Sequence, residues 1–133
     1  MIKGLDELEV ITLFVEDVPA AKKFYQSVFG LDVIYEDDSS AVVKLKNLMV
    51  NLLDVGNAPT LVEPNAVGAG GSGPRCLFTI AVDDADATVE ELKRHGVTLL
   101  NGPIDRPWGR RTAAFADPAG NVWEIAQLLN ESD

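Results

Sequence analysis

The sequence contains one long pattern twice. Val15-Glu16-Asp17, a segment with helical spacing and Gly30-Leu31 recur as Val82-Asp83-Asp84, a second such segment and Gly96-Val97. The offset between the copies is almost the same at both ends of the pattern. A repeat of this length is too long for a short solenoid unit, so it predicts two similar modules in one chain.

Each copy predicts a strand, a helix and then three strands. In the first, a strand over 10–15 precedes Asp17, a residue typical of helix N-caps, and Gly30 marks the end of the helix. Strands over 31–36, 41–45 and 48–55 follow. In the second, a strand over 77–82 precedes a helix that Asp84 caps and Gly96 ends, and strands over 97–100, 112–116 and 122–128 follow. We therefore predict an α+β fold of two tandem βαβββ modules that form a curved sheet around a cleft.

The length predicts a single domain over 1–133. Within it we expect a first module over 8–56, a flexible Gly-rich linker over 57–74 and a second module over 75–129. The linker holds Ala69-Gly70-Gly71-Ser72-Gly73 but no Lys-Ser or Lys-Thr of a phosphate-binding loop, so we assign no nucleotide site.

Charge and cysteine content restrict the partners and the compartment. The net charge is −10, which disfavours nucleic acid and anionic membranes and favours the approach of a cationic small molecule. Cys76 is the single cysteine, which excludes an intramolecular disulfide and is typical of a reducing compartment. The start of the sequence predicts no signal peptide, and no apolar run has transmembrane length. We expect a cytoplasmic protein.

The repeated βαβββ pattern resembles the vicinal oxygen chelate superfamily, which includes glyoxalases, extradiol dioxygenases and the fosfomycin- and bleomycin-resistance proteins. The resemblance rests on Phe24-Tyr25 in the first helix, on Gly30-Leu31 after it, and on the ending Asp117-Pro118-Ala119-Gly120 followed by Glu124. It covers nearly the whole chain. It is specific for the fold rather than for an activity, because one fold serves many chemistries.

In the enzymes of this family, side chains at four strand positions bind a divalent metal. Two adjacent oxygens of the substrate occupy the open positions of that metal. The resemblance places the four strand positions at Val10, Asn51, Leu77 and Glu124. Two of them are aliphatic and Asn51 is neutral, which leaves Glu124 as the one strong ligand. His95, the only histidine, lies beside the helix-ending Gly96 and has a structural explanation there. We therefore predict no metal and no cofactor, which is similar to the metal-free bleomycin-resistance branch.

Strand alternation predicts the side chains that line the cleft. If Glu124 faces inward, as the resemblance implies, alternate residues of the other inner strands share its side. Trp108 offers a flat face for a planar or cationic ligand, and the alternative is that it anchors an interface or a loop. The partner of Glu124 stays open between Arg106, Arg110, Arg111 and the positive charge of a ligand. The candidate ligand-binding residues are Thr12, Phe14, Asn51, Leu53, Thr79, Trp108, Arg110 and Glu124.

Three functions remain open from the sequence. The favoured one is a protein that binds or sequesters a hydrophobic or cationic small molecule in the cleft without chemistry. The second is an enzyme of lyase or isomerase type, either metal-free with Glu124 as its catalytic group or dependent on weakly held Mg²⁺. The third is a regulatory paralogue with a vestigial cleft. We also expect a homodimer, either domain-swapped or unswapped.

Overall fold

The computed structural model describes residues 2–129 and divides the chain into two compact units. The first unit is Met1–Gly70 and the second is Gly71–Asp133. Their boundary lies inside the linker predicted over 57–74. Each unit contains one copy of the sequence repeat and has its own sheet.

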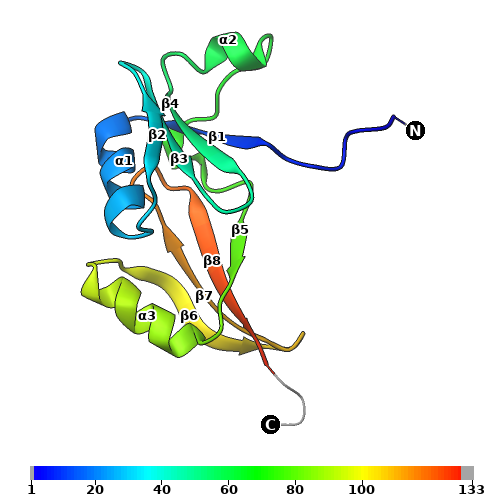
Figure 1. The fold of residues 1–133 in the computed structure, drawn as a ribbon, viewed down its shortest axis with the longest axis vertical. Coiled ribbons are helices and arrows are strands. Elements are labelled where there is room, and N and C mark those ends of the chain that lie inside the picture. The colour runs from blue at the N-terminus through cyan, green and yellow to red at the C-terminus, as the bar shows by residue number, and fades with distance from the viewer. Residues whose placement is uncertain (1, 130–133) are drawn as a thin grey trace. The chain divides into compact units, whose positions relative to one another are not determined.

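The first unit is a four-stranded sheet with one long helix (Figure 1). The sheet order is β1-β4-β3-β2, in which β1 runs parallel to β4 and the other neighbours are antiparallel. The elements are β1 (Val10–Val15), α1 (Val18–Ser27), β2 (Val33–Glu36), β3 (Ser40–Lys44), β4 (Met49–Asp54) and the short α2 (Pro59–Val62).

The second unit repeats this topology with the order β5-β8-β7-β6. Here β5 runs parallel to β8, and β8 and β6 each pair antiparallel with β7. Its elements are β5 (Phe78–Ala81), α3 (Ala85–Arg94), β6 (Leu99–Arg106), β7 (Arg110–Ala116) and β8 (Val122–Leu128), preceded by the 3₁₀ turn η1 (Gly70–Ser72). The predicted α+β architecture of two tandem βαβββ modules is therefore confirmed.

Both predicted helix starts are confirmed, with the same capping geometry. Asp17 Oδ1 accepts a hydrogen bond from the amide of Ala20 at 3.0 Å, and Asp84 Oδ1 accepts one from Ala87 at the same distance. Each bond satisfies one of the amides that the first turn of a helix leaves without an intrahelical partner. The repeated Val-x-Asp pattern therefore sets where each helix begins.

Each unit has a core between its helix and one face of its sheet. In the first unit, Tyr25 of α1 is fully buried, and Val15, Val43 and Leu52 are fully buried on its strands. The core of the second unit contains the ring pair Phe78–Trp123, whose centroids lie 5.0 Å apart. Its other buried side chains include Val89, Leu92, Phe115 and Ile125. The opposite face of each sheet is not the one on which α1 or α3 packs, and we call it the helix-free face.

The structure differs from the sequence predictions at β6 and in the linker. Instead of the predicted strand over 97–100, β6 begins at Leu99 and continues to Arg106, because its pairing with β7 continues past register shifts after Leu99 and Asn101. Gly102, with φ of +91°, allows the irregular backbone there. The linker contains α2 and η1 rather than being without regular structure. None of the helices between residues 2 and 129 is both long and apolar enough to cross a membrane.

Candidate functional site

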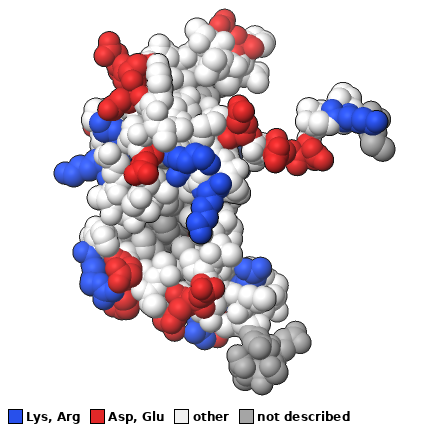
Figure 2. Space-filling model, in the orientation of Figure 1, with Lys and Arg blue, Asp and Glu red and all other residues white. Residues whose placement is uncertain are grey.

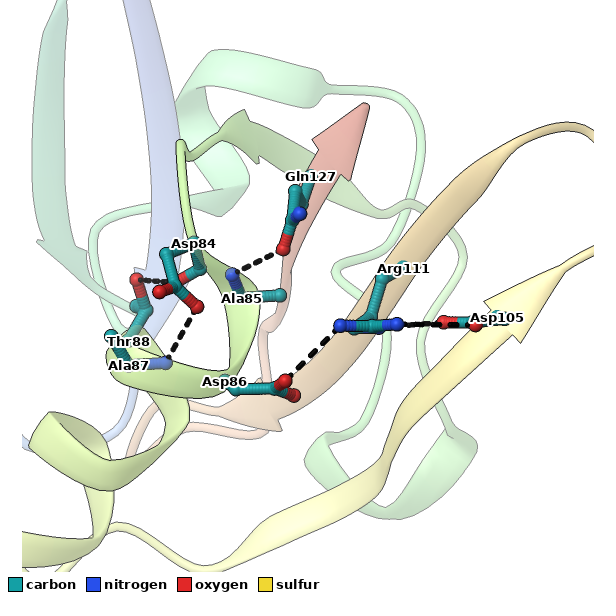
Figure 3. A network of polar contacts seen from close by, with 8 residues as sticks. All are labelled: Asp84, Ala85, Asp86, Ala87, Thr88, Asp105, Arg111 and Gln127. Atoms are coloured by element: carbon teal, nitrogen blue, oxygen red, sulfur yellow. Dashed lines mark hydrogen bonds and ion pairs between the residues drawn. The ribbon is translucent and has the colours of Figure 1, made fainter. Parts of the chain in front are cut away.

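Two contacts to α3 identify the two faces of the second sheet (Figure 3). Gln127 Oε1 on β8 accepts a hydrogen bond from the amide of Ala85, at 2.9 Å. Arg111 on β7 bonds Asp86 of the same helix, at 3.1 Å. Because neighbouring residues of a strand point to opposite faces, the alternate set lies on the helix-free face. That set is Thr112, Ala114, Glu124 and Ala126.

Glu124, the strongest of the predicted site residues, is bound to a hydroxyl. Thr79 on β5 lies directly opposite it in the parallel register, and Thr79 Oγ1 donates to Glu124 Oε1 at 2.9 Å. No arginine among the described residues forms an ion pair with this carboxylate. The two predicted site residues therefore meet, and Glu124 carries a negative charge that no described cation neutralises.

Arg111, one of the three arginines considered as a partner of Glu124, lies on the wrong face for that role. It reaches Asp105 on β6 with two bonds, at 2.6 and 3.2 Å, and Asp86 with a third (Figure 3). The hydrogen bonds and charge of Arg111 lower the pKa of Asp105, and the two carboxylates raise the pKa of Arg111. Its role is to hold α3 to the β6–β7 hairpin.

Arg106 and Arg110 lie on the helix-free face. Arg106 Nε donates to Thr112 Oγ1 at 3.0 Å, and its Nη2 lies 3.4 Å from Asn101 Oδ1. Trp108, in the turn between the two strands, is 67% exposed, and its ring centroid lies 6.0 Å from the guanidinium carbon of Arg106. The structure thus places the predicted Trp108 and Arg110 in one hairpin with Arg106.

The first unit carries the other predicted residues on its own helix-free face. Thr12 and Asn51 are opposite each other in the parallel pairing of β1 with β4, and Phe14 is opposite Leu53. Asn51 Oδ1 is buried and accepts no hydrogen bond from the residues that the structure describes. A buried acceptor without a donor is uncommon, and Asn51 Oδ1 is such an acceptor within the part of the chain that the structure describes.

The four positions that the family resemblance predicts as metal-ligand positions have side chains with few donors for a metal. Val10 and Leu77 have aliphatic side chains, Asn51 offers one neutral oxygen and Glu124 one carboxylate. Within residues 2–129, no group of three or more His, Cys, Asp or Glu side chains is placed to hold a metal ion. A tightly bound transition metal therefore does not fit these positions.

A shallow depression of about 280 Å³ lies elsewhere in the first unit, beside the N-terminal end of β4. It is lined by Glu7, Leu8, Glu9, Lys44, Asn47, Leu48 and Met49. None of the predicted ligand-binding residues contributes to it. Its lining combines charged side chains of both signs with the apolar side chains of Leu8, Leu48 and Met49.

The structure adds two site residues that the sequence did not predict, Asn101 and Thr112. Thr112 is 1% exposed, and both side chains accept hydrogen bonds from Arg106. Thr112 is the first residue of the strand predicted over 112–116, so alternation from Glu124 could have identified its face. Asn101 could not be found, because it lies in the irregular part of β6.

Surface charge is mixed on the face of the molecule drawn in Figure 2. Lys and Arg side chains form small separate groups there, and acidic side chains lie among them. The chain as a whole has 21 acidic against 11 basic residues. At long range the net negative charge therefore attracts a cationic ligand and repels an anionic one.

Comparison with known families gives one family match. The model described as the Glyoxalase/Bleomycin resistance protein/Dioxygenase superfamily matches residues 7–125. A crystal structure of a glyoxalase/bleomycin resistance protein/dioxygenase from Nocardioides superposes with a TM-score of 0.86 at 20% identity. That superposition covers 98% of this chain and 88% of the other. At this level of identity the likeness concerns the fold.

Two curated relatives are similar in sequence. YraH of Bacillus subtilis (strain 168), an uncharacterised protein, is 29% identical over 90% of this chain and 96% of its own length. The anthracycline biosynthesis protein DnrV of Streptomyces peucetius is 29% identical over 89% of this chain. The match spans only 40% of the length of DnrV.

Proposed function

Because the chain belongs to the Glyoxalase/Bleomycin resistance protein/Dioxygenase superfamily, we propose that it binds a small molecule with a cationic group, without metal-dependent chemistry. The observation that carries the proposal is the environment of Glu124. Its carboxylate lies on the helix-free face, bonded to the neutral hydroxyl of Thr79, with no described cation beside it. An ammonium group of a ligand would form a charge-assisted hydrogen bond there.

The surroundings of Glu124 support a ligand with apolar surface as well. Ala114 lies opposite Glu124 on β7 and Ala126 follows it on the same face of β8. Both alanines are buried, with 6% and 3% of their surface exposed, so they form an apolar surrounding for Glu124. Trp108 offers an exposed aromatic ring on the same unit, beside the guanidinium of Arg106, and this ring favours a planar group. A planar amine combines these requirements.

Two features argue for binding rather than the usual metal-dependent reaction of the family. The donor set at Val10, Asn51, Leu77 and Glu124 holds a single carboxylate. The described residues also contain no alternative cluster of three metal-ligating side chains. A reaction would therefore depend on Glu124 alone, which supplies one acid–base group and no group that stabilises a developing charge.

The test is a fluorescence titration with an amino-sugar anthracycline, chosen because the relative DnrV is named for anthracycline biosynthesis. The neutral aglycone, which lacks the amine, is the matched ligand. We expect Glu124→Gln to weaken binding of the amine about tenfold, since a hydrogen bond to a charged group is lost, and to leave the aglycone unchanged. Trp108 emission reports binding, with Trp108→Phe as the control that leaves Trp123.

Glu90→Gln removes the same charge from an exposed position on α3 and should leave both affinities unchanged. Equal affinity of the amine for the parent chain and Glu124→Gln would overturn the proposal. Recovery of a chemically altered ligand that depends on Glu124 would support the enzyme instead. Elemental analysis of dialysed protein is the complementary experiment, and about one tightly held metal per chain would also overturn it.

A further inference from the structure

Two arginines lie opposite each other on the helix-free face of the second sheet. Arg106 at the end of β6 is the register partner of Arg110 at the start of β7, and both are partly buried. Like charges directly opposite each other on neighbouring strands repel and are destabilising. Among residues 2–129, no carboxylate forms an ion pair with either arginine. The pair therefore lacks a described counter-charge.

Arg106 is oriented by neutral partners. Its Nε donates to the buried hydroxyl of Thr112 and its Nη2 lies within reach of Asn101 Oδ1, which leaves Nη1 without a described acceptor. Guanidinium groups bind carboxylates through pairs of parallel N–H groups. The three other arginines differ from this pair. Arg94 on α3 and Arg111 on β7 have carboxylate partners, and Arg75 lies in an exposed loop.

Glu124 lies in one row across the sheet, and the guanidinium of Arg106 reaches the far end of that row at Asn101, whereas Arg110 starts β7 outside the row. The register places Thr79, Glu124, Ala114 and Asn101 side by side on the order β5-β8-β7-β6. Neighbouring strands are about 4.8 Å apart, so Glu124 on β8 and Asn101 on β6 are separated by about 10 Å. Ala114, 6% exposed, lies between them. Opposite charges thus flank a small apolar floor without pairing with each other.

We propose that Arg106 and Arg110 form a subsite for a carboxylate, so that the ligand of this protein carries both an ammonium and a carboxylate group. This inference deepens the proposed function and rests on it for the ammonium at Glu124. An aromatic or aliphatic segment spanning about 10 Å between the two charges matches the strand spacing. The amino-sugar anthracycline is then a probe of the Glu124 end alone.

The test uses three matched probes built on one benzene ring. The first carries an aminomethyl group and, in the para position, a butanoate chain, which separates the two charges by about 10 Å to match the strand spacing. The second replaces the butanoate by butyl, and the third replaces the aminomethyl group by methyl. Binding is measured by calorimetry or by Trp108 emission. We expect the doubly charged probe to bind about tenfold more tightly than either singly charged one.

Four variants assign the contribution of each charge. Arg110→Gln leaves the bonds of Arg106 in place, and Arg106→Gln removes them. In both variants we expect the carboxylate to stop contributing, so that the doubly charged probe binds like the amine. Glu124→Gln should have the converse effect, so that the doubly charged probe binds to it no more tightly than the probe that carries the carboxylate alone. Arg75→Gln, which removes one exposed charge outside this face, should preserve the full preference.

The outcomes separate this inference from the proposed function. If the amine binds through Glu124 and the carboxylate adds nothing, the proposed function stands and the arginine subsite is overturned. If the carboxylate binds through Arg106 and Arg110 and the amine adds nothing, the subsite stands and the role of Glu124 is overturned. If no probe binds at about 1 mM, the doubly charged ligand is overturned. Urea unfolding of each variant, compared with the parent, shows whether a lost preference reflects a lost fold.

Discussion

Thr79 and Glu124 are 45 residues apart in the chain, yet they face each other across the parallel strands β5 and β8, joined by a hydrogen bond of 2.9 Å. The bond directs one oxygen of the carboxylate toward β5. The second oxygen has no described partner of its own. Thr79 therefore orients the carboxylate of Glu124 without neutralising its charge. An arginine at position 79 would neutralise that charge.

The first prediction concerns this hydroxyl. Replacing Thr79 by Val keeps the side-chain shape and removes the donor, so the free energy of unfolding should fall by about 1 kcal/mol or less, because the pair is exposed. Amine affinity should fall less than in Glu124→Gln, since the charge remains. Urea titration and ligand titration measure the two effects. Thr79→Ser retains a hydroxyl, so its free energy of unfolding and its amine affinity should be close to those of the parent chain. A larger loss of either quantity in Thr79→Ser than in Thr79→Val would contradict the role of the hydroxyl.

The second prediction concerns Gly102 in β6. A Cβ there would lie 2.6 Å from Ala113 Cα and even nearer to the carbonyl oxygen of Thr112, so β6 and β7 would have to separate. Gly102→Ala should therefore destabilise the second unit and weaken the carboxylate probe by displacing Arg106. Gly120 also has positive φ, at +88°, but open space around it, so Gly120→Ala isolates the backbone cost of roughly 1–2 kcal/mol. Equal urea midpoints for the two variants would show that the close approach is not a constraint.

The third prediction concerns the contact that holds α3 to the hairpin. Arg111 reaches both Asp86 and Asp105, so Arg111→Gln should lower the urea midpoint of unfolding. Arg111→Lys should recover it only in part, because an ammonium cannot form the paired bonds to Asp105. Arg94→Gln, which breaks an exposed pair within α3, is the matched control and should have a smaller effect.

The pH dependence of that contact has a definite sign. The pKa of Asp105 is lower in the folded chain, so its stabilising contribution is present above the ordinary carboxyl pKa and is lost as the pH falls through the folded value. The difference in urea midpoint between the parent chain and Arg111→Gln should therefore shrink on acidification. A difference that grows toward low pH would rule out the pairing with Asp105 as its cause.

The fourth prediction concerns Asp37, in the turn between β2 and β3. The amide of Ser39 and the hydroxyls of Tyr35 and Ser40 donate to its carboxylate and lower its pKa from 3.8 to about 2. Because the folded pKa is the lower one, the contribution of Asp37 is present above pH 3.8 and is lost toward about pH 2.

Asp37→Asn keeps an acceptor oxygen but has no charge to lose. The stability advantage of the parent chain over Asp37→Asn should therefore be constant near neutral pH and decrease between about pH 4 and 2. Urea midpoints of both chains across that range measure it. Asp38→Asn, in the same turn and without these bonds, should show no such decrease, and an identical decrease in both variants would count against the assignment.

The fold was predictable because its signals are local. Asp17 and Asp84 cap helices whatever the rest of the chain does, and strand alternation placed Thr79 and Glu124 on one face correctly. The β1 strand over 10–15 and β8 over 122–128 have the predicted bounds, since both are apolar runs with clear neighbouring turns. The single-domain assignment, the homodimer and the ligand stay predictions.

The arrangement of the arginines was less predictable because it depends on register. Whether Arg110 or Arg111 faces α3 follows from how β7 pairs with β8, and the sequence offered both residues. Arg106 was a candidate, but its contact with Asn101 requires a strand that continues through Gly102 and Pro103. These residues are typical of turns, and the irregular pairing around them is set by tertiary contacts rather than local preference.

The position of β8 has a consequence for how the protein is made. It is the last strand among residues 2–129 and yet a middle strand of its sheet, where it pairs with both β5 and β7. During synthesis, β5 can therefore form the strand pairing of its own sheet only after Val122–Leu128 has left the ribosome. Glu124 arrives in the same segment, so the second sheet is completed at the step that delivers the proposed ligand-binding carboxylate.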